Sequence, residues 1–292
     1  MRVSRSKSCR AALLTGMVMS AAAPAFAGQP TDGAINFQAP ATGSMRQIVD
    51  FHNFILPIIV VITLLVLALL AWVMIRYNRW TNPTPRKFTH NTLVEVIWTV
   101  VPVLILVVIA IRSFPILHAQ ERAPPAAVTI KVTASSWAWA YEYQDLGVTV
   151  NSNLLPEDQA VAQQRPYLLA VDNPIYVPVG ENVQVLISSN DVIHSWTVPA
   201  FGVKQDAIQG RTNVGWFNVE RAGTYYGQCS ELCGINHAYM PIEVRAVPRA
   251  EFERWIVEQG GSLEPPAEAA AETAPAAAPA EAAPADAAPA QP

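Results

Sequence analysis

The chain has 292 residues, a formal net charge of -4, 51% hydrophobic residues and 14% charged residues. A chain of this length can hold one domain of ordinary size together with membrane segments. The small negative charge argues against nucleic acid as a partner, because nucleic-acid-binding domains carry a basic patch. The excess of hydrophobic over charged residues indicates membrane segments rather than a soluble protein.

Residues 1–27 have the pattern of a cleavable signal peptide. Basic residues precede an apolar run over 11–23, and the small-residue motif Ala25-Phe26-Ala27 follows it. The run is shorter than the about 20 residues that a spanning helix needs, which argues against an uncleaved anchor. We therefore expect export, an exported segment over 28–50, and a mature chain that keeps only Cys229 and Cys233.

Two further apolar stretches, 51–76 and 92–112, predict transmembrane helices in a hairpin. The second contains Glu95 near its start and Pro102 inside. The loop between them, 77–91, carries Arg79, Arg86 and Lys87 and no acidic residue. The positive-inside rule places such a loop in the cytoplasm. Both ends of the mature chain are then expected on the outer side of the membrane.

After Pro124-Pro125 the pattern changes to short segments rich in β-branched and aromatic residues, separated by Gly, Pro, Asn and Asp. The expected strands are 128–132, 137–143, 167–171, 182–188, 215–219, 223–227 and 241–247. This spacing is typical of an all-β Greek-key sandwich, here over 125–260, with a closing helix at 249–259. Residues 261–292 are rich in Ala, Pro and Glu and predict a disordered tail.

Six candidate metal ligands come from this domain, and all of them except His194 share one loop. The set comprises the side chains of His194, Cys229, Cys233, His237 and Met240 and the backbone carbonyl of Glu231. Sulfur and imidazole ligands suit a copper ion that cycles between Cu(I) and Cu(II). A mononuclear blue-copper loop needs only one cysteine, so the second thiolate indicates two coppers that both sulfurs bridge.

Other interpretations of the cysteine pair remain open at this point. In an oxidising compartment the two cysteines could form a disulfide. A copper chaperone or thiol-redox membrane protein can also use two cysteines four residues apart. Such proteins usually have one anchor and a distant histidine, whereas this chain has two predicted anchors and His237 beside Cys233.

The segment QCSELCGINHAYMP (228–241) closely resembles the copper A loop of cytochrome c oxidase subunit II, and DVIHSWTVP (191–199) resembles the segment with that family's first histidine ligand. The resemblance runs from about Phe51 to Trp255. It implies a cupredoxin-like domain in which both thiolates bridge two coppers. The two histidines, the methionine and the Glu231 carbonyl complete the coordination. The Glu231 side chain would help bind a magnesium ion shared with subunit I.

The resemblance also implies the function and the partners. It implies a bacterial aa3-type oxidase of the inner membrane, with the copper domain on the periplasmic side. The chain would accept electrons from cytochrome c and pass them to haem a in subunit I, where oxygen is reduced. Haem a, haem a3 and copper B are expected only in subunit I, and subunit III and membrane lipids would be further partners. Quinol oxidases lack the copper ligands, and the propeller of nitrous oxide reductase has no room here.

The segment SWAWAYEY (136–143) resembles the aromatic segment of the family, which implies that Trp137 is the point where electrons enter. Without the family, two tryptophans in a strand more often belong to a core. A patch of acidic residues is expected to dock cytochrome c, although surface carboxylates are often simply solvated. The candidate docking residues are Glu142, Asp145, Asp172 and Asp191. The family often has another acid near Asn151, which is absent here.

Glu95 lies in TLVEVIWT (92–99), which resembles the family segment whose glutamate stands at the mouth of a proton channel in subunit I. A carboxylate in a membrane helix is costly, which favours a functional role. The alternative is that Glu95 lies near enough to the cytoplasmic end to reach water. A further departure from the family is Gln209, where a proline is usual.

Overall fold

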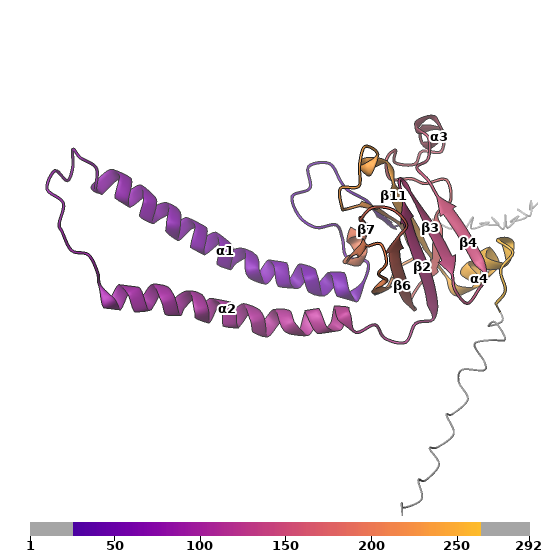
Figure 1. Cartoon of the computed structure of the whole chain (residues 1–292), viewed down its shortest axis with the longest axis horizontal. Helices are drawn as coiled ribbons and strands as arrows, with labels where there is room; N and C mark the ends of the chain where they lie inside the picture. The colour runs from indigo at the N-terminus through magenta and orange to yellow at the C-terminus, as the bar shows by residue number, and fades with distance from the viewer. Residues whose placement is uncertain (1–25, 264–292) are drawn as a thin grey trace, which may run out of the picture.

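The structure is a computed structural model, and it describes residues 26–263. A hairpin of two long helices, α1 (Gly43–Arg76) and α2 (Thr92–Glu121), projects from a β-sandwich (Figure 1). The expected signal peptide lies outside the described residues except for positions 26 and 27. Most of the expected tail, 264–292, lies outside them as well.

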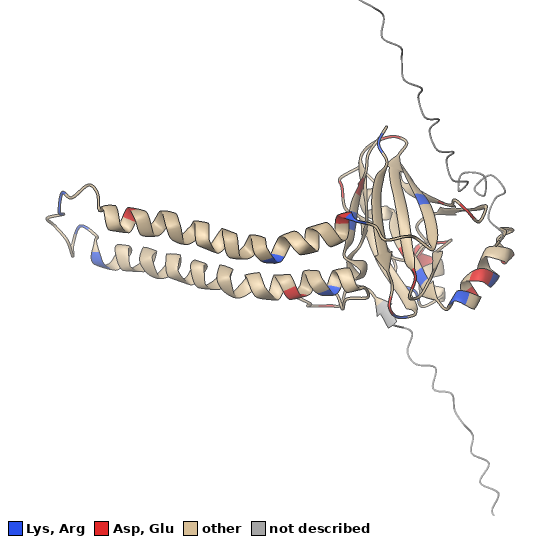
Figure 2. Cartoon of the chain, turned by 90° about the horizontal axis from the view of Figure 1, so that it is seen from below, with Lys and Arg blue, Asp and Glu red and all other residues tan. Residues whose placement is uncertain are grey.

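Both helices extend beyond the apolar stretches. The helices have 34 and 30 residues, so each expected span lies within a longer helix. The side chains of Thr42 and Asn91 cap their N-termini by accepting the N–H groups of Met45 and Val94. Charged residues do not end a helix, and the helices continue through them toward the sandwich. Figure 2 shows a long middle section of the hairpin without charged residues. Length and composition of both helices suit a membrane crossing.

The sandwich consists of two sheets. The first has the order β5-β11-β10-β7-β8, with β1 also paired to β10, and the second has the order β4-β3-β2-β6-β9. The strands of the first sheet are β1 (Phe26–Gly28), β5 (Ile175–Pro178), β7 (His194–Val198), β8 (Val203–Ala207), β10 (Gly223–Cys229) and β11 (Pro241–Val247). The strands of the second sheet are β2 (Val128–Ser135), β3 (Ala138–Tyr143), β4 (Val148–Ser152), β6 (Asn182–Ser189) and β9 (Asn213–Asn218).

The core lies between the sheets and follows from the alternating pattern of the strands. Every second residue of β6 is buried, and in β3 the inward side chains are Trp139, Tyr141 and Tyr143. Trp196 of the opposite sheet donates its indole N–H to the Tyr141 hydroxyl over 3.3 Å. Full burial of one large apolar side chain stabilises a fold by roughly 1.5–3 kcal/mol. These aromatic residues therefore hold the two sheets together.

Six of the seven expected strands are confirmed, as is the closing helix α4 (Arg249–Glu258), but the expected strand at 167–171 is wrong. Leu168 has a left-handed backbone with φ of 69°, and only Val171 forms an isolated bridge. The Arg165 guanidinium reaches the carbonyl of Val171 over 2.7 Å and also pairs with the buried carboxylate of Glu243. The segment therefore curls around this arginine. The sequence patterns also missed five strands, β1, β4, β5, β7 and β8, and the short helix α3 (Glu157–Ala162).

The hairpin is fixed to the sandwich at the start of α1. The backbone N–H of Ala41 donates to the carbonyl of Ala200, and the Thr42 hydroxyl donates to the carbonyl of Phe201 over 2.7 Å. Met45 is buried against the domain, and Arg46 forms an ion pair with Glu220. The first turn of α1 is therefore part of the folded domain.

Candidate metal centre

The candidate ligands converge at one end of the sandwich, where β7 starts and β10 ends. These two strands are neighbours in one sheet, and Cys229 pairs with Trp196 in their register. His194 is the first residue of β7 and Cys229 the last of β10. The short 3-10 helix η2 (His237–Tyr239) lies in the connection from β10 to β11. The strand order therefore brings His194 to the loop that carries the other candidates.

The donor atoms of all six predicted ligands lie close together. The two Sγ atoms are 3.8 Å apart, and both cysteines are free and buried. Cys229 Sγ lies 4.0 Å from His194 Nδ1 and 3.3 Å from the carbonyl oxygen of Glu231. Cys233 Sγ lies 3.6 Å from the Nδ1 atom of His237 and 3.6 Å from the Sδ atom of Met240. Each sulfur thus has its own imidazole, and the pair of sulfurs lies between them.

A carboxylate orients one of these imidazoles. His194 is fully buried, and its Nε2 lies 2.9 Å from Asp191 Oδ1. When Nε2 carries the proton and donates it to Asp191, the lone pair of Nδ1 faces the sulfurs. Metal-binding histidines commonly have such a partner, which fixes the tautomer and the ring orientation.

Asp191 is itself held by several donors. The backbone N–H groups of Ser136 and Val192 donate to its carboxylate over 2.6 and 2.7 Å, and the Ser189 hydroxyl lies 3.3 Å away. Burial favours the neutral acid, but the hydrogen bonds from Ser136, His194 and Val192 outweigh it and hold the pKa of Asp191 well below its usual range. The carboxylate stays ionised at neutral pH. The sequence signal for this contact was an acidic residue three positions before a histidine.

The pKa of the second thiol is shifted in the opposite direction, because no set of hydrogen bonds outweighs the effect of burial there. Burial and then the neighbouring thiol of Cys229 raise the pKa of Cys233 to about 12. At neutral pH this thiol therefore keeps its proton in the absence of a strong local cation. A bound metal ion supplies that cation and stabilises the thiolate. The donor set, two buried free thiols with two imidazoles and a thioether, fits a soft, redox-active metal.

Both tryptophans of the predicted aromatic segment contact the metal loop, which is the segment 229–240 with the candidate ligands. Trp137 is half-buried and lies before β3, and its Nε1 donates to the carbonyl of Cys233 over 3.2 Å. Trp139 is buried and donates from Nε1 to the carbonyl of Met240 over 3.0 Å. Gly234 lies under the Trp137 ring, where a Cβ atom would be 3.0 Å from Cζ2. Sequence patterns did not indicate this role of Gly234.

The four candidate docking residues lie in different settings. Asp145 is exposed, and Glu142 is exposed but forms an ion pair of 3.1 Å with Lys131. Asp172 accepts hydrogen bonds from the backbone and the side chain of Asn153. Asp191, as described above, is joined to His194. Each carboxylate except that of Asp145 therefore has a local partner among the described residues.

Two predicted functional side chains lie away from the group of ligands. Glu95 belongs to the first turn of α2, which is at the end of the hairpin far from the sandwich (Figure 1). Its carboxylate accepts the backbone N–H of Asn91 over 3.2 Å, so it also caps the helix. The side chain of Glu231, in contrast to its carbonyl, is exposed.

Two protein families match the chain, one over the hairpin and one over the sandwich. The chain matches the family "Cytochrome C oxidase subunit II, transmembrane domain" over residues 30–116 and "Cytochrome C oxidase subunit II, periplasmic domain" over residues 128–247. The periplasmic domain of subunit II of cytochrome oxidase from Bradyrhizobium japonicum is 43% identical, with a TM-score of 0.44 over 48% of this chain and 97% of that chain.

Full-length relatives agree with this assignment. "Probable cytochrome c oxidase subunit 2" of Rickettsia felis is 45% identical over 234 residues, which cover 80% of this chain and 74% of the relative. "Cytochrome c oxidase subunit 2" of Cereibacter sphaeroides is 42% identical over 255 residues, 81% of this chain and 84% of the relative. The protein of the same name from Zea mays is 41% identical over 77% and 89% of the two chains. The chain belongs to the cytochrome c oxidase subunit II family.

Proposed function

We propose that His194, Cys229, Cys233, His237, Met240 and the Glu231 carbonyl hold the dinuclear copper A centre of a bacterial aa3-type cytochrome c oxidase. As a member of its family, the chain is the electron-accepting subunit of this oxidoreductase. The observation that carries the proposal is the pair of free, buried sulfurs 3.8 Å apart, each facing the Nδ1 atom of a histidine.

When bound, the two coppers would take single electrons from cytochrome c and pass them to haem a in subunit I, where oxygen is reduced. The residues of this chain supply a fixed frame for that step. Ligands on a loop between two strands change position little, which keeps the reorganisation on electron transfer small. The hydrogen bond that His194 Nε2 donates to Asp191 adds to this rigidity by fixing the His194 ring.

Trp137 is the proposed point where the electron enters. Its indole ring is half-buried, and it is joined to the metal loop by the hydrogen bond to the Cys233 carbonyl. A ring in this position offers a short covalent and hydrogen-bonded route from the surface to a sulfur ligand. The acidic residues Glu142, Asp145, Asp172 and Asp191 are proposed to attract the basic face of cytochrome c. Such a field raises the association rate more than the affinity.

Further assignments complete the proposal. Glu95 delivers protons to a channel in subunit I, and the Glu231 side chain helps bind a magnesium ion shared with subunit I. Haem a, haem a3 and copper B belong to subunit I, and subunit III and membrane lipids are further partners. The sandwich faces the periplasm of a bacterial inner membrane, which the basic loop at 77–91 supports through the positive-inside rule.

Copper loading of the purified full-length chain tests this function. We expect two coppers per chain, with the absorption and electron paramagnetic resonance spectra of a mixed-valence pair. Cys233→Ser should abolish the pair, because a hydroxyl is a poor substitute for a bridging thiolate. Ser230→Ala, in the same loop, is the matched control and should bind copper normally. A wild-type chain that binds one copper, or none, would contradict the proposal.

A further inference from the structure

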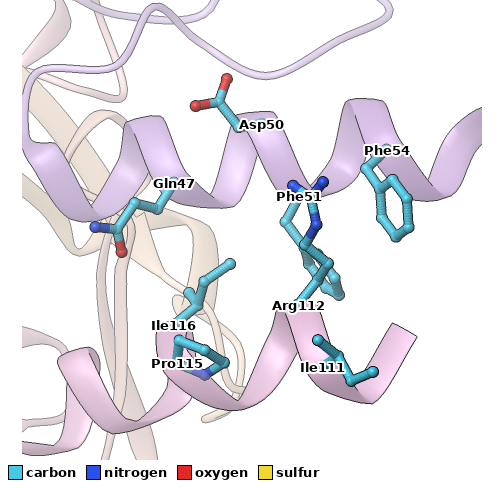
Figure 3. Close-up of a pocket in the computed structure, with 8 residues that line it drawn as sticks. All are labelled: Gln47, Asp50, Phe51, Phe54, Ile111, Arg112, Pro115 and Ile116. Carbon is cyan, nitrogen blue, oxygen red and sulfur yellow. The ribbon is translucent and has the colours of Figure 1, made fainter. Parts of the chain in front are cut away.

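A cavity of about 290 Å³ lies between α1 and α2 at the end of the hairpin nearest the sandwich. Figure 3 shows its two walls, with Gln47, Phe51 and Phe54 on α1 and Arg112 on α2. The Arg112 side chain reaches across the gap toward α1. Its Cζ atom lies 5.1 Å from the centroid of the Phe54 ring. The cavity therefore has a cation at its rim and aromatic rings beside it.

Arg112 has no anionic partner among residues 26–263. The structure gives its guanidinium no carboxylate within salt-bridge distance and no hydrogen bond in that part of the chain; the ring of Phe54 is the contact described. Asp50 also lines the cavity, but its carboxylate points away from α2 (Figure 3). The cation is thus directed toward the gap between the helices and is open to a ligand.

The depth of Arg112 in the membrane makes a partner necessary. The charge-free run before it, residues 96–111, rises by about 24 Å as a helix, whereas the hydrocarbon core is about 30 Å thick. The Cα atoms of Arg112 and Glu95, which bound this run, therefore cannot both lie in the headgroup layers. A charged side chain at the hydrocarbon boundary is costly without a counter-charge. At this level of a bilayer, the abundant anions are the phosphates of the lipids.

A second cavity continues along the same two helices toward the membrane interior. It has about 250 Å³ and is lined by Ile58, Val101, Leu104, Ile105 and Val108. On α2, Val108 is one turn from Arg112, and Leu104 and Val101 follow it. The two cavities together have a cationic outer end and a purely aliphatic inner end. This order of polarity matches that of a lipid with its headgroup outward.

We propose that this groove binds a diacyl phospholipid of the outer leaflet. The Arg112 guanidinium donates to the phosphodiester, and the amide of Gln47 is a second donor at the same rim. One acyl chain lies between the helices against Ile58 and Val108. A free phosphate would use the arginine but not the aliphatic continuation of the groove. A helix of another subunit would fill the aliphatic part and would need a carboxylate at this level to pair with the arginine.

Native mass spectrometry of the oxidase complex tests this site. Complexes with wild-type chain, Arg112→Gln, Val108→Phe and Leu106→Phe are stripped of loosely bound lipid and titrated with one synthetic phosphatidylethanolamine. Leu106 is 64% exposed and does not line either cavity, so it is the matched control for added bulk. Copper content, measured on each complex, reports that the subunit has folded and assembled.

The wild-type and Leu106→Phe complexes should retain one phospholipid more than the other two complexes. In Arg112→Gln the anchoring charge is lost, and in Val108→Phe the acyl chain is displaced. Either change should lower the affinity of this site for the phospholipid at least tenfold. Equal phospholipid counts in all four complexes would overturn the proposal. So would inorganic phosphate that competes fully for the site while Val108→Phe has no effect, or a density map with a protein segment in the groove.

Discussion

The indole Nε1 of Trp137 donates a hydrogen bond to the carbonyl oxygen of Cys233 over 3.2 Å. This bond joins the proposed point of electron uptake directly to the residue that carries one of the two sulfurs. It also places the ring over Gly234, which has a φ of 122° and no side chain to push the ring away. The position of Trp137 therefore depends on a glycine in the metal loop.

Gly234→Ala should displace Trp137 while leaving the ligands in place. The new Cβ would lie 3.0 Å from Cζ2 of the ring, and the backbone would be strained by roughly 1–3 kcal/mol. We expect copper to be retained and electron transfer from cytochrome c to slow roughly 10- to 100-fold, as for other small misplacements of reacting groups. Stopped-flow reduction of the copper centre measures this rate.

Gly147→Ala is the control for backbone strain alone. Gly147 also has a positive φ, of 68°, but a Cβ there would contact nothing within 4 Å. This variant should lose some stability and transfer electrons at the wild-type rate. If both variants slowed electron transfer equally, the effect would arise from strain rather than from the position of Trp137.

Asp191→Asn should weaken copper binding, which a docking residue alone would not do. The amide cannot offer His194 the charged acceptor that now lies 2.9 Å from Nε2. Loss of such a partner commonly costs roughly 10- to 100-fold in metal affinity. Competition with a copper chelator measures the affinity. Asp145→Asn, at an exposed carboxylate without a described partner, should leave the affinity unchanged.

The salt dependence of cytochrome c oxidation separates the two roles of Asp191. A docking role predicts slower association in Asp145→Asn and Asp191→Asn alike, with the difference from wild type disappearing as salt screens the charges over about 8–10 Å. If Asp191→Asn keeps the wild-type copper affinity and shows only this salt-dependent loss, its contact with His194 has no role in holding the metal.

Two substitutions at Glu95 separate helix capping from proton uptake. Gln keeps an oxygen that can accept the Asn91 N–H, whereas Ala removes both the charge and the acceptor. If Glu95 delivers protons, both variants should consume oxygen more slowly than wild type while cytochrome c still reduces the copper at the normal rate. Oxygen uptake by fully assembled enzyme is the deciding measurement. Normal turnover in Glu95→Gln, with poor assembly only in Glu95→Ala, would leave capping as its role.

The ion pair between Arg46 and Glu220 should make the junction of hairpin and sandwich pH-dependent. The hydrogen bond from Arg46 is the main reason why the pKa of Glu220 is lowered in the folded protein. A lowered folded-state pKa adds stability above the unfolded value of about 4.3, and this stability is lost as the pH falls through the folded pKa. Glu220→Gln should therefore have a slightly lower Tm than wild type at pH 7.

The same comparison at low pH completes the test. Below the folded-state pKa the wild-type carboxyl is protonated, and the two Tm values should converge. The effect should be small because both side chains are partly exposed, at 51% and 41%. If the Tm difference persisted unchanged at pH 3, it would arise from packing rather than from charge.

Most of the candidate metal ligands and the hairpin could be predicted because local spacing determines their positions. Cys229, Cys233, His237 and Met240 lie within one loop, so a fold of almost any kind would bring them together. The apolar spans are equally local. His194 lies 35 residues before Cys229, and its position beside the loop depends on the pairing of β7 with β10. The residue types made His194 a candidate ligand, and the resemblance to a family indicated that it lies beside the loop.

The wrong strand at 167–171 shows what sequence patterns cannot supply. Tyr167, Leu168 and Leu169 suit a strand, but the segment instead follows the contacts of Arg165 with Val171 and Glu243. Glu243 is 78 residues away in sequence from Arg165. A buried ion pair between such distant residues leaves no periodic signal. Gly234 and Ser136 were missed for the same reason, because their roles depend on Trp137 and Asp191.

The attachment of α1 to the sandwich has a consequence for electron tunnelling. The carbonyls that accept hydrogen bonds from Ala41 and Thr42 belong to residues 200 and 201. These residues lie a few positions after the end of β7, and β7 begins with His194. The height of the metal loop above the bilayer is therefore set within this one chain. Because tunnelling rates fall exponentially with distance, a fixed height would keep the electron transfer rate constant when the thickness of the membrane changes.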